Sequence, residues 1–558
     1  MRLPRPRRAI APVRAKPRSA APPARGSLSA GLSFGAASFL TTTVATLFTS
    51  VFIARLYGVV VVGQFALVYA PVAAAALLST VREQPALQRA IALLPPRHTY
   101  ATALFYAVFA FSSGLTLAIA LLGAGAVYLL FHGPIHHPGL VAPALVNLAG
   151  YTVFTNTCMN LDSVFIAFRD GRRLFVLRLH QALLYLALIF AGRLVSGSVW
   201  SLVATMILSW ALPCVHRLVE VRRWLVLRVP RAEARAGLRA LPEMLRFGLR
   251  LTPAGLLWGV CDQSATWVLG SVAPVATVGA YSRAWSLGQR FLEARLRLSE
   301  LLFPTLVERR QTGDQAGFDR AVIDSLRYGS AFLLLFAAVG GGAAKGIMAV
   351  FGPRFVPAAT ALAFLLLVPA FTTMVFLVSQ ALIASDRALR LTASAAVRLV
   401  VTLPAVVVLT ERYGITGAGV GMALGAAAQL ACQLLVVQRE LIGLVARWWS
   451  PRQVAGQVAA YAGAFAAARM TLRGLHGYGG LLAALVLGTV VYLALLAAVG
   501  GLSGRDRERA RRLRARLAAA RQQPSASAPF TPPRTQPPDR GLVLARAQRA
   551  PSTDDRDR

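Results

Sequence analysis

The sequence predicts an all-α membrane protein with about fourteen transmembrane helices, and three observations lead to this fold class. Hydrophobic residues make up 56% of the 558 positions, and the mean hydropathy is +0.58, well above that of soluble proteins. The apolar residues gather in stretches near the length of about 20 residues that a helix needs to cross a membrane. Arginine is distributed unevenly among the short segments between these stretches.

Each apolar stretch is bounded by polar or charged residues, and we expect each to form one span. The third stretch exceeds the length of a single crossing, so we expect that helix to tilt or kink. The expected spans lie at residues 30–54, 62–80, 101–130, 140–166, 174–192, 199–217, 247–271, 280–306, 328–350, 358–384, 391–410, 415–438, 454–471 and 479–500.

The arginines between the spans test this count, because arginine-rich loops stay on the cytoplasmic side of a membrane. When the loops are taken alternately, one set contains twenty-three arginines and the other contains five. Both terminal tails are also basic, which predicts two cytoplasmic termini and therefore an even number of spans. The formal net charge of +37 thus comes from tails and loops rather than from one basic face, which argues against nucleic-acid binding.

The two halves of the chain resemble each other at a nearly constant offset. The stretch from Thr49 matches the stretch from Ala265 at an offset of 216, which places Gly63 on Gly279, and AFRDGRRL matches ASDRALRL at an offset of 217. This repeat predicts two six-helix lobes that enter the membrane in the same sense, with a cleft between them. The expected parts are a disordered basic cytoplasmic tail (1–29), an N-lobe (30–218), a basic cytoplasmic linker (219–246), a C-lobe (247–438), two extra C-terminal helices (439–500) and a disordered basic C-terminal tail (501–558).

Charged residues are rare inside the expected spans, and four of them share one face of the eighth span. Arg290, Glu293, Arg297 and Glu300 are spaced by three, four and three residues, which places them on one side of a helix. Charges within a membrane either line a water-filled cavity or neutralise one another between helices. Glu293 and Arg297 stand in the favourable order for an i,i+4 ion pair, so both interpretations remain open.

Other polar positions within the spans are candidates for the same cavity. Asp262 is either a structural partner for an arginine of the eighth span or a proton or cation site, and Arg398 lies in the middle of its own span. Asn156 and Asn160 form an i,i+4 amide pair, a pattern that is also typical of contacts between helices. Trp258 is a candidate for stacking against a sugar ring.

The sequence gives no sign of a metal site or of ATP hydrolysis. The three histidines of the segment HGPIHHPG have no acidic or cysteine ligand beside them, and the four cysteines lie singly in apolar stretches. No phosphate-binding loop of the P-loop type is present. We therefore expect no metal and no cofactor.

Three stretches carry a resemblance to a known family. They are DQSATWVLGSVAPVATVGAYSRAWSLGQRF from Asp262, RLYGVVVVGQFAL from Arg55 and FGPRFVPAATALAFLL from Phe351. In their order and spacing they resemble the bacterial polysaccharide and lipid-linked oligosaccharide flippases, which belong to the multidrug/oligosaccharidyl-lipid/polysaccharide exporter superfamily. The resemblance extends from residue 30 to about residue 500.

The resemblance implies a V-shaped, two-lobed transporter that works by alternating access and is not an enzyme. Its expected substrate is an undecaprenyl-pyrophosphate-linked oligosaccharide, moved across the bacterial inner membrane for O-antigen, capsule or exopolysaccharide biosynthesis. Membrane lipids and the polysaccharide polymerase machinery are the expected partners, and the coupling ion, H⁺ or Na⁺ where one is used, stays open. Arginine suits such a substrate because its planar guanidinium makes paired, charge-assisted hydrogen bonds to phosphate.

Two other functions are weighed against this one. A multidrug or cation antiporter of the same superfamily is expected to carry a carboxylate on the first span, where no acidic residue precedes Arg55. A membrane glycan polymerase or ligase needs a catalytic loop outside the membrane, and no outer loop exceeds roughly ten residues, which is short even for a soluble protein.

The arginine distribution predicts the sidedness of each loop. In a background without the native cysteines, a single cysteine at Gly133 should react with a membrane-impermeant thiol reagent on intact cells. A single cysteine at Gly313 should react only after permeabilisation. The reverse labelling at either position would rule out the fourteen-span topology.

Overall fold

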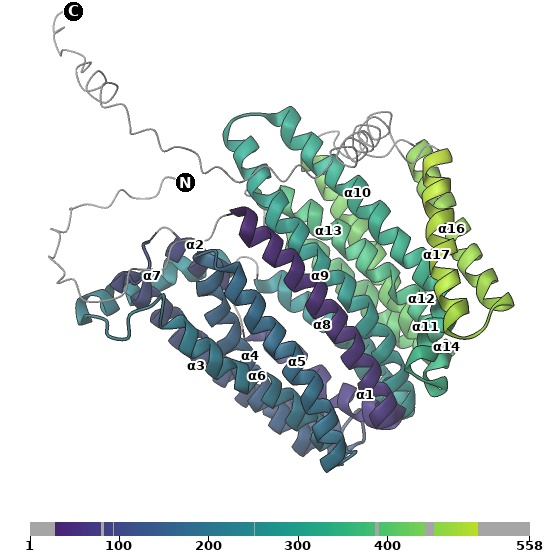
Figure 1. The fold of residues 1–558 in the computed structure, drawn as a ribbon, viewed down its shortest axis with the longest axis horizontal. Helices are drawn as coiled ribbons and strands as arrows, with labels where there is room; N and C mark the ends of the chain where they lie inside the picture. The colour runs from purple at the N-terminus through teal and green to yellow at the C-terminus, as the bar shows by residue number, and fades with distance from the viewer. Residues whose placement is uncertain are drawn as a thin grey trace, which may run out of the picture. The chain divides into compact units, whose positions relative to one another are not determined.

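The structure is a computed structural model that describes residues 28–79, 83–92, 94–249, 252–384, 390–440 and 451–499. Within these ranges the side chains of residues 28–40, 85, 247–248, 292–305, 307–308, 311, 384, 438–440 and 451 are not described. All regular elements in the described ranges are helices (Figure 1).

The helices fall into three groups along the chain. The first half and the segment after it contain α1 (Leu28–Leu78), α2 (Glu83–Ala92), α3 (Thr99–His132), η1 (Pro138–Leu140), α4 (Val141–Ala167), α5 (Gly171–Val195), α6 (Val199–Val221) and α7 (Arg231–Leu249). The second half contains α8 (Thr252–Val272), α9 (Val275–Gln311), α10 (Gln315–Gly342), α11 (Ala344–Phe351), η2 (Pro353–Ala358), α12 (Ala359–Leu365), α13 (Leu367–Ala384) and α14 (Arg390–Glu440). Two further helices, α16 (Pro451–Gly474) and α17 (Gly477–Ala498), pack against each other and against α10.

The described helices account for the fourteen predicted spans. Nine helical segments are long and apolar enough to cross a membrane, and two of these, Thr41–Leu78 and Arg390–Val437, each contain a non-helical glycine that divides them into two helices. The helices α8, α9 and α16 have 21, 37 and 24 residues, enough for one crossing each, although polar residues lower their hydropathy. The prediction of an all-α membrane protein is confirmed.

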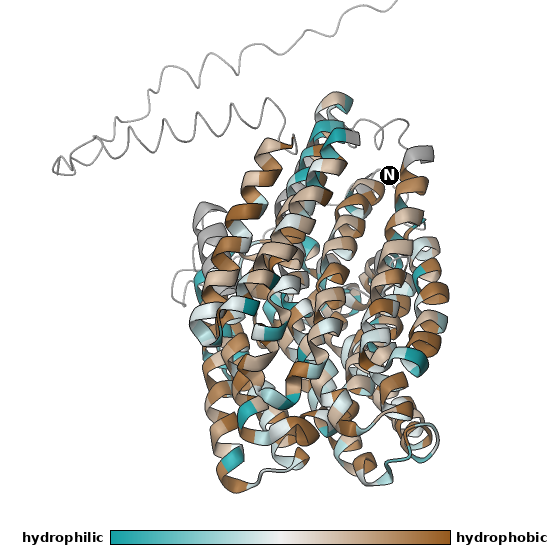
Figure 2. Ribbon diagram, turned by 90° about the vertical axis from the view of Figure 1, so that its right-hand side faces the viewer, coloured by the Kyte–Doolittle hydropathy of each residue, from teal (hydrophilic) through white to brown (hydrophobic). Residues whose placement is uncertain are grey.

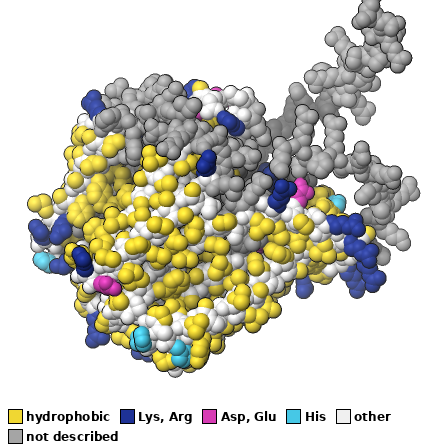
Figure 3. All heavy atoms as spheres, turned by 180° about the vertical axis from the view of Figure 1, so that it is seen from behind, with side chains coloured by type: hydrophobic (Ala, Val, Ile, Leu, Met, Phe, Trp, Pro, Cys, Tyr) yellow, Lys and Arg dark blue, Asp and Glu magenta, His cyan; other side chains and the backbone are white. Residues whose placement is uncertain are grey.

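The surface of the helices is apolar, as expected for a protein in lipid. On α3 the side chains of Leu121, Leu122 and Leu129 are 68–75% exposed. Burying one such side chain is worth about 1.5–3 kcal/mol, so leaving many of them in water would be costly. Figure 2 shows hydrophobic residues along most helices, and Figure 3 shows hydrophobic side chains over most of one face with arginine and lysine near its edges. These apolar surfaces are therefore the ones that meet the membrane.

Glycines let the chain reverse within α14. Gly414 has φ +57° and ψ −135°, outside the helical region, and it separates the two halves of this helix. Three later glycines face the first half so closely that an added Cβ would lie 1.8–2.7 Å from it. Their neighbours follow in reverse order: Gly417 meets Leu409, Gly421 meets Val406 and Gly425 meets Thr402. The two halves therefore run antiparallel and in close contact, the packing that small residues at every fourth position allow.

Three predicted segments differ from the helices observed. The predicted span at 328–350 is two helices, because α10 ends after three consecutive glycines and α11 begins at Ala344. The predicted span at 358–384 is divided between α12 and α13. The predicted linker at 219–246 contains most of α7, which forms because Leu241 and Met244 pack on the apolar core around α3 and α4. The overlong third span is a single helix of 34 residues, α3.

The two halves of the protein meet where α1, after its break at Gly58, crosses the start of α9. A Cβ on Gly63 would lie 2.0 Å from the Val275 carbonyl oxygen, and a Cβ on Gly279 would lie 2.0 Å from that of Val59. At the offset of 216 between the repeats, Gly63 corresponds to Gly279 and Val59 corresponds to Val275. The two contacts are thus copies of each other, as expected for an interface that contains a two-fold axis. This symmetry supports the internal repeat and its register.

Replacing either crossing glycine by alanine should destabilise the protein, because the added methyl group forces two backbones apart. Overpacking of this kind costs about 1–3 kcal/mol, and the symmetry predicts similar costs for Gly63→Ala and Gly279→Ala. The measurement is the midpoint of thermal unfolding in detergent. Gly125→Ala is the matched control, since a Cβ at Gly125 of α3 meets nothing within 4 Å. Unchanged midpoints in both crossing variants would contradict this packing.

Candidate functional site

A buried arginine lies where α9 packs against α1. Arg283 follows Gly279 by one helical turn, is 8% exposed, and donates from Nη1 to the Ser50 Oγ of α1 at 3.2 Å. The Ser286 hydroxyl of α9 lies 3.4 Å from the same Ser50 oxygen. The Nε of Arg283 is buried without a hydrogen-bond partner, and among the described side chains Arg283 has no carboxylate partner. Such a cation is costly to bury because it loses several kcal/mol of hydration.

A second arginine lies on the same face of α9. Arg290 is two helical turns beyond Arg283 and half-buried. The Tyr185 hydroxyl of α5 interacts electrostatically with both arginines, so all three groups lie near one another. Three of the four charged residues predicted on this face have side chains outside the described residues: Glu293, Arg297 and Glu300. The sequence analysis missed Arg283, although its spacing of seven residues from Arg290 is a detectable signal.

An ion pair lies inside the second half of the protein. The Asp262 Oδ1 of α8 is 2.7 Å from the Arg398 Nη2 of α14, and the side chains are 23% and 4% exposed. The structure thus gives Asp262 an arginine partner on α14, whereas the sequence suggested an arginine of α9 or a proton or cation site. The guanidinium offsets the negative charge of this carboxylate, so the pair attracts a further cation less strongly than a lone aspartate would.

A small cavity lies beside this ion pair. Its walls include Trp258, Asp262, Thr372, Arg398 and Gln429, from α8, α13 and α14. Its volume of about 20 Å³ suits a water molecule and is too small for a sugar ring. The Trp258 Nε1, the Arg398 Nε and both amide atoms of Gln429 are buried without hydrogen-bond partners, so a water there would have several. Trp258 therefore lines a water-sized space and has no room to stack a sugar in this conformation.

Asn156 and Asn160 lie within a polar cluster of the first half. Both amides donate to the Ser112 Oγ of α3, at 2.7 and 3.0 Å, and this hydroxyl donates to the Glu83 carboxylate of α2 at 2.9 Å. All four side chains are buried. The structure thus joins the two predicted amides to a carboxylate that the sequence analysis missed, because Glu83 lies in a segment expected to be a loop.

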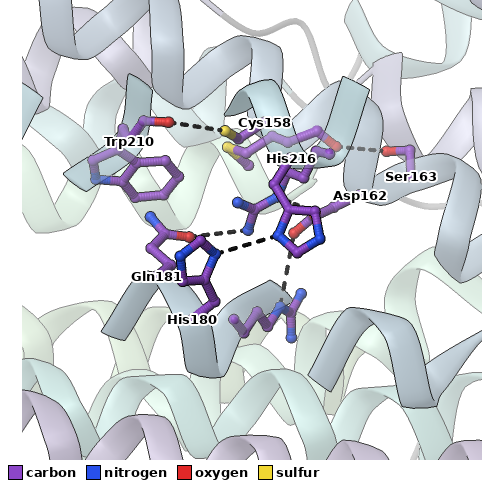
Figure 4. A network of polar contacts seen from close by, with 10 residues as sticks. Cys158, Asp162, Ser163, His180, Gln181, Trp210 and His216 are labelled. Carbon is purple, nitrogen blue, oxygen red and sulfur yellow. Dashed lines mark hydrogen bonds and ion pairs between the residues drawn. The ribbon is translucent and has the colours of Figure 1, made fainter. Parts of the chain in front are cut away.

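A further charged network joins α4, α5 and α6 (Figure 4). The Asp162 Oδ1 accepts a hydrogen bond from the Arg217 Nε at 2.7 Å, and the Arg178 Nε lies 3.7 Å from Oδ2. The Nδ1 atoms of His180 and His216 are 3.3 Å apart. Arg217 is only 1% exposed, and its carboxylate partner offsets the cost of burial. We regard this network as structural.

The described residues contain no group of three or more His, Cys, Asp or Glu side chains that could hold a metal ion. The ring Nδ1 atoms of His132 and His136 lie 3.0 and 3.1 Å from the carbonyl oxygens of Tyr128 and Pro134. His132, the last residue of α3, and His136 thus contact the local backbone.

Comparison with known proteins identifies similar folds. Residues 94–360 match the model of a family described as polysaccharide biosynthesis protein. A structure of the lipid II flippase MurJ in an inward closed conformation matches with a TM-score of 0.62 and 12% identity over 84% of this chain and 99% of that chain. An inward-facing multidrug resistance MATE family transporter of the MOP superfamily matches with a TM-score of 0.58 and 14% identity over 72% and 95% of the chains.

A MOP superfamily transporter from Pyrococcus furiosus, described as having a binding pocket of reverse polarity, matches with a TM-score of 0.54 and 15% identity over 75% of this chain and 97% of that chain. No curated protein sequence matches the chain. The family match and these structures confirm the resemblance predicted from the sequence.

The Asp262–Arg398 pair should make single and double substitutions differ in their cost. Asp262→Leu leaves a buried guanidinium unpaired, which costs about 3–5 kcal/mol. Asp262→Leu with Arg398→Leu removes both charges and should recover most of that loss. The measurement is the thermal unfolding midpoint of the single and double variants in detergent. A double variant no more stable than Asp262→Leu would show that the pair is not the main contribution of these side chains.

Proposed function

We propose that this chain is a transporter of the multidrug/oligosaccharidyl-lipid/polysaccharide exporter superfamily. We propose further that it flips a pyrophosphate-linked lipid oligosaccharide. The lipid is an undecaprenyl chain, and the glycan is a precursor of O-antigen, capsule or exopolysaccharide. The membrane is the bacterial inner membrane, with both termini in the cytoplasm, because the arginine-rich loops belong on that side.

The observation that carries this proposal is the buried arginine Arg283 at the contact between the halves. Arg283 is buried with an unused Nε donor, and Arg290 adds a second positive charge on the same face. A buried guanidinium with an unused donor is costly, and an anion bound beside it offsets that cost. A pyrophosphate supplies oxygens for both guanidinium groups, each of which can donate two parallel hydrogen bonds.

The neutral groups around Arg283 also suit a phosphate ligand. The hydroxyls of Ser50, Ser286 and Tyr185 belong to α1, α9 and α5, so they approach the arginine from both halves of the protein. Hydroxyl groups donate to phosphate oxygens without adding charge. A site of this composition disfavours the organic cations that a multidrug antiporter exports.

Neutralising Arg283 should impair transport more than folding. We expect Arg283→Gln to reduce flipping at least about 30-fold, the equivalent of ~2 kcal/mol for a lost buried charge contact. Arg283→Lys should recover only part of the rate, because an ammonium group lacks the planar fork. The assay follows the flipping of an undecaprenyl-pyrophosphate-linked oligosaccharide in vesicles that contain the purified protein.

Arg320→Gln is the matched control, because Arg320 is an exposed arginine of α10. It should leave the rate unchanged. Full activity of Arg283→Gln would reject the proposed phosphate contact. Uptake of an organic cation that improves in Arg283→Gln would instead favour the multidrug antiporter.

A further inference from the structure

The helix α7, which lies in the chain between α6 and α8, has two unlike sides. One side packs against the first half of the protein. At Gly237 the backbone of α7 comes so close to α3 that an added Cβ would lie 2.8 Å from the carbonyl oxygen of Ala103. Leu241 and Met244 pack on the apolar core around α3 and α4. This side of α7 is therefore held firmly by α3.

The other side of α7 carries a row of exposed arginines. Arg231, Arg235 and Arg239 are spaced by four residues and Arg246 follows after seven, so the four lie on one side of the helix. No ion pair between described residues includes any of these four arginines. The helix contains four arginines and two glutamates, so it has an excess of positive charge.

Exposed leucines border this row of arginines. Leu238 is three residues after Arg235 and three before Leu241, so it lies between the arginine row and the packed side. It is 56% exposed, and Leu249, three helical turns further along, is 54% exposed. Leucine side chains gain free energy when they leave water. A helix with arginines beside exposed leucines is typical of the boundary between lipid and water.

The contact with α3 indicates the depth of α7 in the membrane. The first residues of α3, up to Phe105, are buried or half-buried, and Tyr106 is the first that is exposed, at 41%. Tyr106 follows Ala103, the contact of Gly237, by one helical turn, and tyrosine is common at the surface of a membrane. The helix α7 therefore lies at the level where the lipid-facing surface of α3 begins. In Figure 3 basic side chains gather at the edge of the molecule where Figure 1, seen from the opposite side, places α7.

We propose that the exposed side of α7 binds the phosphate groups of anionic phospholipids at the membrane surface. Guanidinium groups donate paired, charge-assisted hydrogen bonds to phosphate oxygens. Each basic side chain near an anionic membrane surface strengthens binding about five-fold. Arg231, Arg235, Arg239 and Arg246 thus contact the lipid headgroups, while Leu238 enters the boundary with the acyl chains.

The place of α7 in the chain gives this contact a consequence. Because α7 lies between the last helix of the first half and the first helix of the second, bound lipid would hold the connection between the halves at the membrane surface. An effect of the lipid on flipping rests on the proposed function, whereas the binding of lipid does not.

The test measures which lipids surround α7. In a background without the native cysteines, Leu238→Cys is labelled with the fluorophore NBD, and the protein is reconstituted without its substrate. The vesicles contain spin-labelled phosphatidylglycerol or spin-labelled phosphatidylcholine in both leaflets, so the result does not depend on the orientation of the protein. We expect phosphatidylglycerol to quench the fluorophore at lower mole fractions than phosphatidylcholine. Arg235→Gln with Arg239→Gln should lower this preference at least about ten-fold.

Arg310→Gln with Arg320→Gln is the matched control, because it also removes two positive charges, from the end of α9 and from the exposed surface of α10. It should keep the preference for phosphatidylglycerol. The same fluorophore at Thr312→Cys should be quenched by neither lipid, because the 37 residues of α9 extend about 55 Å, beyond the thickness of a bilayer. The proposal is rejected if neither lipid quenches the fluorophore at Leu238→Cys, or if both quench it equally. A preference that survives in the α7 double variant, or that the control removes as well, also rejects it.

Discussion

The structure depends on the crossing of α1 and α9 at Gly63 and Gly279. Neither residue has a side chain, so the two backbones approach to a distance that a single methyl group would prevent. This contact fixes how the two halves of the protein are aligned along each other. Arg283 follows Gly279 by one turn, and the crossing therefore determines that its guanidinium reaches the Ser50 hydroxyl of α1. The same contact that joins the halves thus creates the proposed binding site.

Three arginines are buried among the side chains that the structure describes, and they divide into two kinds by their partners. Arg217 and Arg398 each have an aspartate at 2.7 Å, which offsets the cost of removing the guanidinium from water. Arg283 has the Ser50 hydroxyl beside it where the other two arginines have an aspartate. A neutral hydroxyl offsets much less of the cost of removing a guanidinium from water. Natural membrane proteins retain such incompletely paired charges mainly where a ligand or an ion pathway uses them. For this reason we assign Arg283, and not the better paired arginines, to the substrate.

The fold could be predicted from the sequence because it depends on properties of single segments. The length of an apolar stretch indicates a span, the loop arginines indicate its direction, and each expected span overlaps a described helix. The partners of polar side chains could not be predicted in the same way. Asp262 and Arg398 are 136 residues apart, and helical periodicity gives the face of one helix but not the neighbour opposite that face. Glu83 was missed because its segment has the composition of a loop.

The charged residues Arg283 and Asp262 lie at positions where the two halves of the internal repeat differ. At the offset that places Gly63 on Gly279, Arg283 corresponds to Leu67, a fully buried aliphatic residue, and Asp262 corresponds to Thr46. The crossing glycines are instead identical in both halves, because a two-fold contact requires the same residue on each side. A bound anion would therefore be held by charge from the second half and by neutral hydroxyls from the first. If one half turned against the other, the anion would remain with Arg283, and the contact with Ser50 would be the one to break.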